Sequence, residues 1–269
     1  MAIVVGFSSS AQLPAYQLFT SKGKKVKYQK MIKKVAKTDV LFFGEYHNNA
    51  IAHWLQLETL KSLGQERKLV LGAEMFEADN QDPLNLYLAD SIDAKGLDTL
   101  ARLWNNYKTD YAPLVNYAKA NNLPFIATNI PRRYASMVYR NGFEVLDSLD
   151  DLQKSWMAPL PIVFDPNLPQ YKAILEMMGG HGSNKTVMAQ AIKDATMAHF
   201  VYQNLDSNAL FIHFNGAFHS DFYEGIVWYL NQLDNTLDVV TISTVTQSRL
   251  QKLDKEHFGR ADYLLVVDE

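Results

Sequence analysis

Short apolar runs alternate along the chain with longer stretches in which apolar positions recur every three or four residues. The strand-like runs are bounded by turn residues and cover residues 40–43, 69–71, 124–127, 210–214, 239–242 and 263–267. Most of them are too continuously apolar for a strand with one wet face, so we expect both faces to be covered. The pattern predicts an α/β fold, with a mainly parallel sheet flanked by helices.

Helical periodicity occupies much of the chain between these runs, at residues 51–63, 112–120, 132–140, 186–205 and 222–233. Residues 152–182 break the alternation, because four prolines are followed by a helical pattern at 171–178 and no strand-like run occurs. We expect this segment to be a helical lid inserted over the sheet. The rest of residues 16–269 is expected to form a single domain around it.

The N-terminal residues 1–7 are apolar and run into small residues at 8–11, which is typical of the end of an export signal. No basic segment precedes them, so an ordinary apolar N-terminal segment is the alternative. We therefore treat residues 1–15 as a candidate export-signal remnant. The chain contains no cysteine, which excludes disulfides, thiolate metal sites and a lipid-anchor cysteine within this sequence.

The charge balance does not indicate a nucleic-acid partner, because 26 basic and 29 acidic residues leave a net charge of −3. Eight lysines between residues 22 and 37 form the strongest cluster. Met31, Ile32 and Val35 are interleaved with them at helical spacing, which favours the solvated face of a helix. A patch for a membrane surface or an anionic ligand is the alternative.

The candidate chemistry lies in two turns of the same type, Gly-Glu-Tyr-His at 44–47 and Gly-Ala-Phe-His at 216–219, and each follows a predicted strand. In open α/β sheets, ligands bind beyond the carboxyl ends of the strands. We therefore expect Glu45, His47 and His219 to face one pocket. A single Gly-x-x-His pattern is only a strand-to-helix turn in most proteins, and its recurrence is what favours a site.

Three further polar residues are expected near the same edge. His53 and Gln56 are three residues apart, and hence on one face of the helix that follows the first turn. Glu74 follows the second predicted strand, where a carboxylate can line a site or serve as a helix N-terminal charge.

Two arginines and an aspartate complete the pocket candidates. Arg132 and Arg133 follow the third predicted strand, where they can bind carboxylate or phosphate groups, or one of them can neutralise Glu74. Asp194 lies on the same helical face as Gln190, and a buried aspartate needs a partner such as a histidine or an arginine.

The predicted lid carries a different chemistry, with polarisable apolar groups, glycines and polar tips. Its candidate ligand-binding residues are Tyr171, Met177, Met178 and His181, followed by Lys185. A flat apolar ring that carries carboxylates would fit such a surface. Ordinary core packing explains the methionines equally well.

Taken together, these motifs resemble the ChaN-like haem-binding uptake proteins over nearly the whole chain from about residue 16. The resemblance rests on residues 44–49 with His53 and Gln56, 74–76, 131–133, 177–182, 190–191 with Asp194, and 214–216 with His219. The family belongs to a wider group with paired Gly-x-x-His turns, which includes erythromycin-esterase-like hydrolases and Tiki-type metal-dependent proteases.

The resemblance implies an exported or lipid-anchored bacterial protein for haem and iron uptake, periplasmic or associated with the outer membrane. Such a homodimer holds two stacked haems, with a tyrosine on each iron and the propionates bound by histidine and lysine across the dimer. Carried over to this chain, the ligands are Tyr171, His181 and Lys185, with Tyr134 and Tyr139 as competitors for the iron. An outer-membrane haem receptor is the implied partner.

The residues also permit a second function, and the enzyme question stays open although haem binding is favoured. Glu45, His47, Glu74 and His219 can surround a reacting centre in a hydrolase, with a general base or a divalent metal that activates water. No Gly-x-Ser-x-Gly elbow is present in the sequence, so attack by water is favoured over a serine nucleophile. No set of residues stands out as a certain metal site, and a non-catalytic partner-binding protein is the third alternative.

Overall fold

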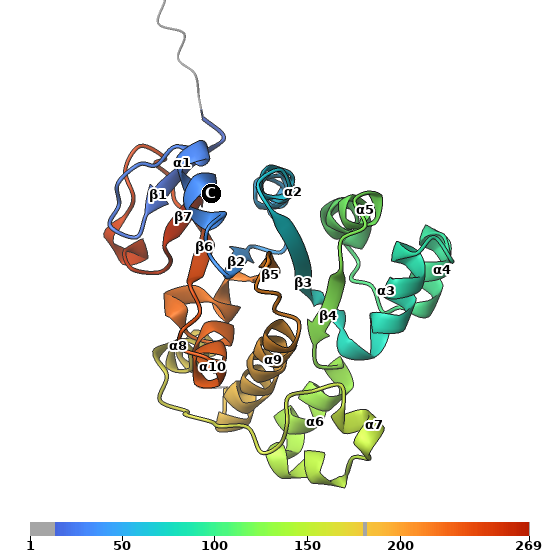
Figure 1. Cartoon of the computed structure of the whole chain (residues 1–269). Coiled ribbons are helices and arrows are strands. Elements are labelled where there is room, and N and C mark those ends of the chain that lie inside the picture. The colour runs from blue at the N-terminus through green and yellow to red at the C-terminus, as the bar shows by residue number, and fades with distance from the viewer. Residues whose placement is uncertain (1–13, 180–181, 269) are drawn as a thin grey trace, which may run out of the picture.

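The structure is a computed structural model that describes residues 14–179 and 182–268 (Figure 1). In these residues seven strands form one sheet in the order β1-β7-β6-β2-β5-β3-β4. The strands are β1 (Tyr16–Thr20), β2 (Val40–Glu45), β3 (Lys68–Glu77), β4 (Phe125–Asn129), β5 (Ala209–Gly216), β6 (Val239–Thr246) and β7 (Tyr263–Val267). All neighbouring pairs are parallel except β1 with β7. The prediction of a mainly parallel sheet is confirmed, and the antiparallel edge strand β1 was not predicted.

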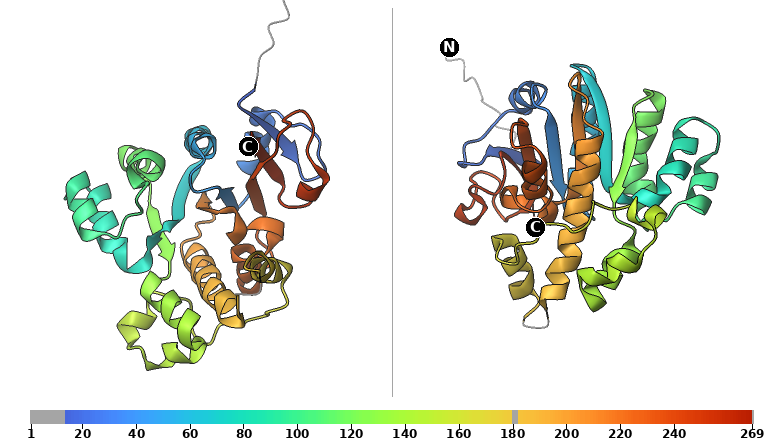
Figure 2. Two further views of the ribbon diagram at one scale, coloured as in Figure 1. Left: turned by 180° about the vertical axis from the view of Figure 1, so that it is seen from behind. Right: turned by 60° about the horizontal axis from the view of Figure 1, so that its bottom comes forward.

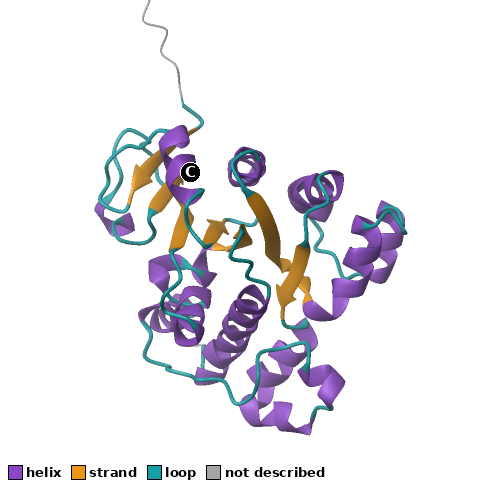
Figure 3. Ribbon diagram, viewed as in Figure 1, coloured by secondary structure: helices purple, strands orange, loops and turns teal. Residues whose placement is uncertain are grey.

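Helices cover both faces of the sheet, as Figures 1 and 3 show. On one side lie α1 (Tyr28–Val35), α2 (Ala50–Gly64) and α5 (Ala112–Ala120), and on the other α9 (Asn184–Gln203) and α10 (Ile226–Leu233). The long α9 crosses in front of the strands in the right-hand view of Figure 2. The short helices α3 (Gln81–Leu88) and α4 (Ala94–Leu100) lie beyond the edge strand β4.

Strand β2 shows why the apolar runs were continuous, because every one of its residues is buried. Leu41 and Phe43 pack in the core under α1, α2 and α5, whereas Val40 and Phe42 pack in the core under α9 and α10. Burying each such side chain contributes about 1.5–3 kcal/mol. Side chains of successive strand residues point to opposite faces, so a strand between two helical layers must be apolar at every position.

The lysine-rich segment forms α1, with Met31, Ile32 and Val35 buried against the sheet. Lys33 and Lys34 lie on its exposed side. The prediction of a solvated helix face is therefore confirmed for these residues.

The region after β5 differs from the predicted helix at 222–233, since α10 begins only at Ile226. Phe222 and Tyr223 adopt positive φ angles of 58° and 61°, in the left-handed region where an α-helix cannot continue. The carboxylate of Asp221, just before these residues, accepts hydrogen bonds from Ser243 Oγ at 2.5 Å and Arg260 at 3.0 Å. The predicted start at residue 222 was wrong, and the contacts that hold this turn come from distant parts of the chain.

The segment predicted as a lid contains α7 (Asp151–Lys154) and α8 (Pro169–Met177), preceded by α6 (Arg132–Asn141). Its described residues form no strand. Helix α8 packs on the side of the sheet that carries α9 and α10 (Figure 2). Among the described helices, none has the length and apolar character needed to cross a bilayer. The candidate export signal lies mostly in residues 1–13, outside the described part of the chain.

Candidate functional site

The site lies where the three adjacent strands β2, β5 and β3 end. Glu45 at the end of β2 is in register with Gly216 at the end of β5, and Ala73 of β3 pairs with Phe214 of β5. Glu74 was expected after its strand but lies within β3, which continues to Glu77 through a register irregularity. Glu45 contacts Gln56 on α2, and Glu74 contacts His219 beside α9. The two carboxylates therefore lie at the same edge of the sheet, Glu45 on the face covered by α2 and Glu74 on the face covered by α9.

Glu45 is a fully buried carboxylate that is held by three side chains. Its oxygens accept hydrogen bonds from Gln56 Nε2 at 2.6 Å and from the Tyr111 hydroxyl at 2.6 Å, and they lie 3.0 Å from His47 Nδ1. Burial, followed by the charge of Glu45, raises the pKa of Tyr111 far above its usual value. Glu45 is thus an orienting group for its neighbours rather than a free carboxylate in the pocket.

His53 and Gln56 support this arrangement from behind, on one face of α2 as predicted. His53 Nδ1 lies 3.0 Å from Gln56 Oε1, and its Nε2 lies 3.2 Å from the backbone oxygen of His47. Both side chains are buried. They fix the first turn and do not line the pocket itself.

His47 is the exposed member of the first turn, with 48% of its side chain accessible. The hydrogen bond with Glu45 raises its pKa, against the opposing effect of burial, and Glu74 adds to the increase. The other edge of the His47 ring lies over Gly216. A Cβ atom added to Gly216 would be 2.8 Å from both Cε1 and Nε2 of His47. The close approach of this ring to the backbone of the second turn requires glycine at position 216.

His219, from the second turn, lies between two buried carboxylates. Its Nε2 is 3.2 Å from Glu74 Oε1, and its Nδ1 is 2.5 Å from Asp194 Oδ1 on α9. Glu74 also accepts a hydrogen bond from the Gly216 amide at 2.7 Å, and Asp194 accepts one from the Tyr171 hydroxyl at 3.2 Å. The expected partner of Asp194 is therefore found, and Glu74 is neutralised by His219 rather than by an arginine.

The protonation of this group follows from its surroundings. Burial alone would lower the pKa of His219, but Glu74 and Asp194 raise it to about 10. Burial raises the pKa of Glu74, yet the positive charge of His219 more than offsets that effect and the pKa is lowered. For Asp194 burial dominates and the pKa is raised. His219 is consequently a cation near neutral pH, suited to donate a proton and not to act as a base.

Both Gly-x-x-His turns open on a single pocket of about 690 Å³. Its polar wall includes Tyr46, His47, Glu74, Gln190, Lys193 and His219, and its apolar wall includes Ile174, Met177, Met178 and Phe218. The polar wall comes from the strand ends and α9, and α8 supplies most of the apolar wall. The pocket is within the range of 300–1,000 Å³ that is usual for small-ligand sites.

The residues expected to bind haem from the lid are only partly brought to this pocket. Met177 and Met178 line it, but Tyr171 is 1% exposed and packs in the core beneath α8 and α9. Lys185 donates to the backbone oxygen of Arg140 at 2.8 Å, outside the pocket. His181 lies outside the described residues.

Lys193 and Tyr46 are among the pocket-lining residues that were not predicted from the sequence. Lys193 is three residues after Gln190, so helical spacing alone could have placed it on the same face of α9. Tyr46 stands between Glu45 and His47 in the first turn and lines the pocket. No local signal pointed to Tyr111, which reaches Glu45 across 66 residues of sequence.

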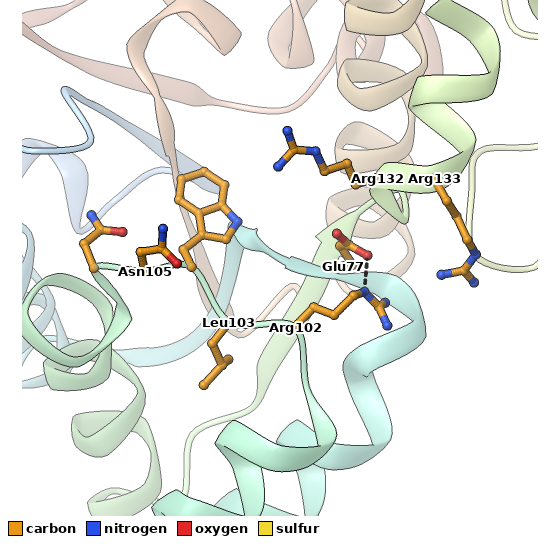
Figure 4. A pocket seen from close by; sticks show the side chains of 8 residues that line it. Glu77, Arg102, Leu103, Asn105, Arg132 and Arg133 are labelled. Carbon is orange, nitrogen blue, oxygen red and sulfur yellow. Dashed lines mark hydrogen bonds and ion pairs between the residues drawn. The ribbon is translucent and has the colours of Figure 1, made fainter.

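Arg132 and Arg133 do not line this pocket. Both are among the residues that border a second pocket of about 630 Å³, together with Glu77, Arg102, Leu103, Trp104, Asn105 and Asn106 (Figure 4). Trp104 packs edge-on against His47 with ring centroids 5.0 Å apart, so the two pockets are neighbours. In the described part of the chain, no group of three or more histidines and carboxylates is arranged to hold a metal ion.

The fold and the strand-end pocket define an α/β ligand-binding protein built on one mainly parallel sheet. A family model described as haem-binding uptake, Tiki superfamily, ChaN matches residues 31–230. The chain belongs to this family, as the sequence motifs predicted.

Solved structures show the same fold. One of them, described as cofacial haem binding to ChaN of Campylobacter jejuni, has a TM-score of 0.71 and 17% identity, over 94% of this chain and 97% of that one. A structure from Bacillus cereus has a TM-score of 0.54 and 12% identity, over 89% and 91% of the two chains. A search of curated proteins found no match.

Proposed function

We propose that this protein binds haem for bacterial haem or iron uptake, and that the haem lies in the strand-end pocket. The observation that carries the proposal is the pairing of an apolar wall, made by Ile174, Met177 and Phe218, with a polar wall that contains Tyr46. A flat ring system can pack against the first wall while its metal and carboxylates meet the second. Membership of the haem-binding uptake family supports this proposal.

Tyr46 is the tyrosine that we propose as the iron ligand, in place of Tyr171. Ferric iron is bound by a phenolate, which must be both accessible and deprotonated on binding. Burial and the charge of Asp194 raise the pKa of Tyr171 far above its usual value, and its hydroxyl is used by Asp194. Of the competing tyrosines, Tyr134 is buried in the core under α6 and Tyr139 is exposed on α6 away from the pocket. Tyr46 lines the pocket directly.

Lys193 and His47 are the groups that we propose for the haem carboxylates in this pocket. The positive charge of His219 is balanced by its two carboxylate partners, whereas Lys193 makes no ion pair with a described residue. Lys193 thus takes the role assigned to Lys185 from the sequence.

A homodimer with the pocket at its interface is part of the proposal. Met177 is 70% exposed at the edge of the apolar wall, and a second copy packed there would cover it. The Campylobacter protein is described as binding haem cofacially, an arrangement that two such pockets facing each other would allow. The proposal also includes export to the periplasm or the outer membrane and delivery from an outer-membrane receptor, and family membership is its only support for these.

A haemin titration tests the proposal. Wild-type protein should give a saturable change in the Soret band, and Tyr46→Phe should shift the band and weaken binding by at least tenfold. Tyr171→Phe should keep the wild-type spectrum, and Tyr202→Phe, an exposed tyrosine on α9, serves as the neutral control. Wild-type protein with no saturable spectral change would overturn the proposal, and loss of the signal only in Tyr171→Phe would restore the original assignment.

A hydrolase is the second candidate, favoured by the orientation of His47. Its Nδ1 is fixed by the buried Glu45, which leaves Nε2 for a water or a substrate, while His219 is a cation that can donate a proton. Turnover of ester or amide substrates by haem-free protein, abolished in His47→Gln, would support this function. A panel of such substrates without turnover would exclude it.

A further inference from the structure

The second pocket has a charge arrangement that the haem proposal does not use. Segment 102–106 forms one side of it, and Glu77 at the end of β3 and Arg132 at the start of α6 form the other. Two of its arginines are already committed. Arg102 Nε lies 2.8 Å from Glu77 and also pairs with Asp79, and Arg133 lies 2.6 Å from Asp79.

Arg132 is left with an unbalanced charge. Three guanidinium groups against the carboxylates of Glu77 and Asp79 leave one net positive charge in the cluster. Within residues 14–179 and 182–268, no hydrogen bond or ion pair is formed by the Arg132 guanidinium. Figure 4 shows its side chain extended over the pocket, whereas that of Arg133 points away from it.

The neighbours of Arg132 suit an anionic oxygen group. Trp104 lines the same pocket as Arg132. The Asn105 side chain is exposed at the same pocket, where an amide can donate to an oxygen ligand. The Trp104 ring also packs on His47, and Asn106 donates to the backbone oxygen of His47 at 2.7 Å. The second pocket, called the arginine pocket below, and the strand-end pocket are therefore separated by side chains in direct contact, with Trp104 lining the first and His47 lining the second.

We infer that the arginine pocket binds a carboxylate, with the Arg132 guanidinium as its cation. A guanidinium and a carboxylate form two parallel charge-assisted hydrogen bonds, which favours arginine over lysine for this purpose. The carboxylate has two sources. It belongs either to the ligand of the strand-end pocket, in which case the inference rests on the proposed haem function, or to a separate small carboxylate.

The test uses Arg132→Gln, with Arg140→Gln as a matched control that removes one positive charge from the exposed end of the same helix. Haemin and the dimethyl ester of the same porphyrin are titrated into each protein, and citrate is tested for thermal stabilisation of the ligand-free protein. If haem supplies the carboxylate, Arg132→Gln weakens haemin binding about tenfold and leaves binding of the ester unchanged.

If a separate carboxylate is bound, citrate raises the Tm of wild-type protein and of Arg140→Gln but not of Arg132→Gln, and haemin binding is equal in all three. Equal behaviour of Arg132→Gln and wild type in both assays would overturn the inference, as would equal losses in Arg132→Gln and Arg140→Gln. Failure of the haem proposal is recognised separately, because wild-type protein would then bind neither porphyrin while the citrate assay still reports on Arg132.

Discussion

Nδ1 of His219 lies 2.5 Å from Oδ1 of Asp194, and both side chains are almost completely buried. The opposite edge of the ring faces Glu74 at 3.2 Å. One imidazolium thus joins helix α9 to strand β3 through the turn that follows β5. A charge in this position is stabilised by both carboxylates, and each carboxylate is stabilised in turn by the cation.

We expect His219→Gln to destabilise the protein strongly. Without the imidazolium, Glu74 and Asp194 would be two buried carboxylates with no balancing charge, which costs about 3–5 kcal/mol. Denaturant unfolding measures the loss. His199→Gln is the control, since His199 is half-buried on the same face of the sheet and forms no ion pair with a described residue. Similar losses in the two variants would contradict the role given to His219.

Stability should fall as the pH is raised from neutral. The pKa of His219 is raised to about 10, above the ordinary value of about 6.5 in an unfolded chain. Its contribution is therefore complete below about pH 6.5 and is lost as the pH rises toward 10, with a slope of up to about 1.4 kcal/mol per pH unit. Urea unfolding at a series of pH values, compared with His219→Gln, measures the difference. A difference that is constant from pH 7 to 10 would contradict the raised pKa.

Tyr111→Phe should cost about 1.5–3 kcal/mol, because it removes one of the donors that hold the buried Glu45 carboxylate. Tyr107→Phe is a matched control in the same turn, since that hydroxyl forms no hydrogen bond with a described residue. Thermal or urea unfolding of both variants gives the comparison. A loss for Tyr111→Phe no larger than that for Tyr107→Phe would show that Glu45 does not need this donor.

Gly216→Ala should disturb the site more than the fold. The added Cβ would lie 2.8 Å from the His47 ring, and this half-exposed side chain can move away. We expect a change of less than about 1 kcal/mol in stability, with shifted His47 ring signals in NMR and weaker haemin binding. Gly44→Ala offers the contrast, because its Cβ would meet the backbone of Ala217 at 2.9 Å and should cost about 1–3 kcal/mol. Unchanged His47 signals in Gly216→Ala would refute the contact.

The fold was largely predictable because its signals are local. The apolar run at 40–43 became the buried core of β2, and the pattern at 112–120 became α5 with the same bounds. Strand β1 was missed because only two of its five residues are buried, so it carries no continuous apolar run.

The candidate pocket was predictable in outline for a topological reason. Parallel strands present their carboxyl ends at the same edge, so two Gly-x-x-His turns that follow parallel strands lie at the same edge of the sheet. The sequence alone therefore determined that His47 and His219 face the same edge, and the direct pairing of β2 with β5 brings them into one pocket.

Only the tertiary structure decided what each group does there. Tyr171 was expected at the surface of the lid. The face of α8 that carries Tyr171 instead packs against α9, so this side chain lies in the core beside Asp194. The same packing brings Lys193 to the pocket and leaves Lys185 outside it. Local sequence sets the period of a helix, whereas the face that it buries and the distant side chains that it meets are set by packing against the rest of the chain.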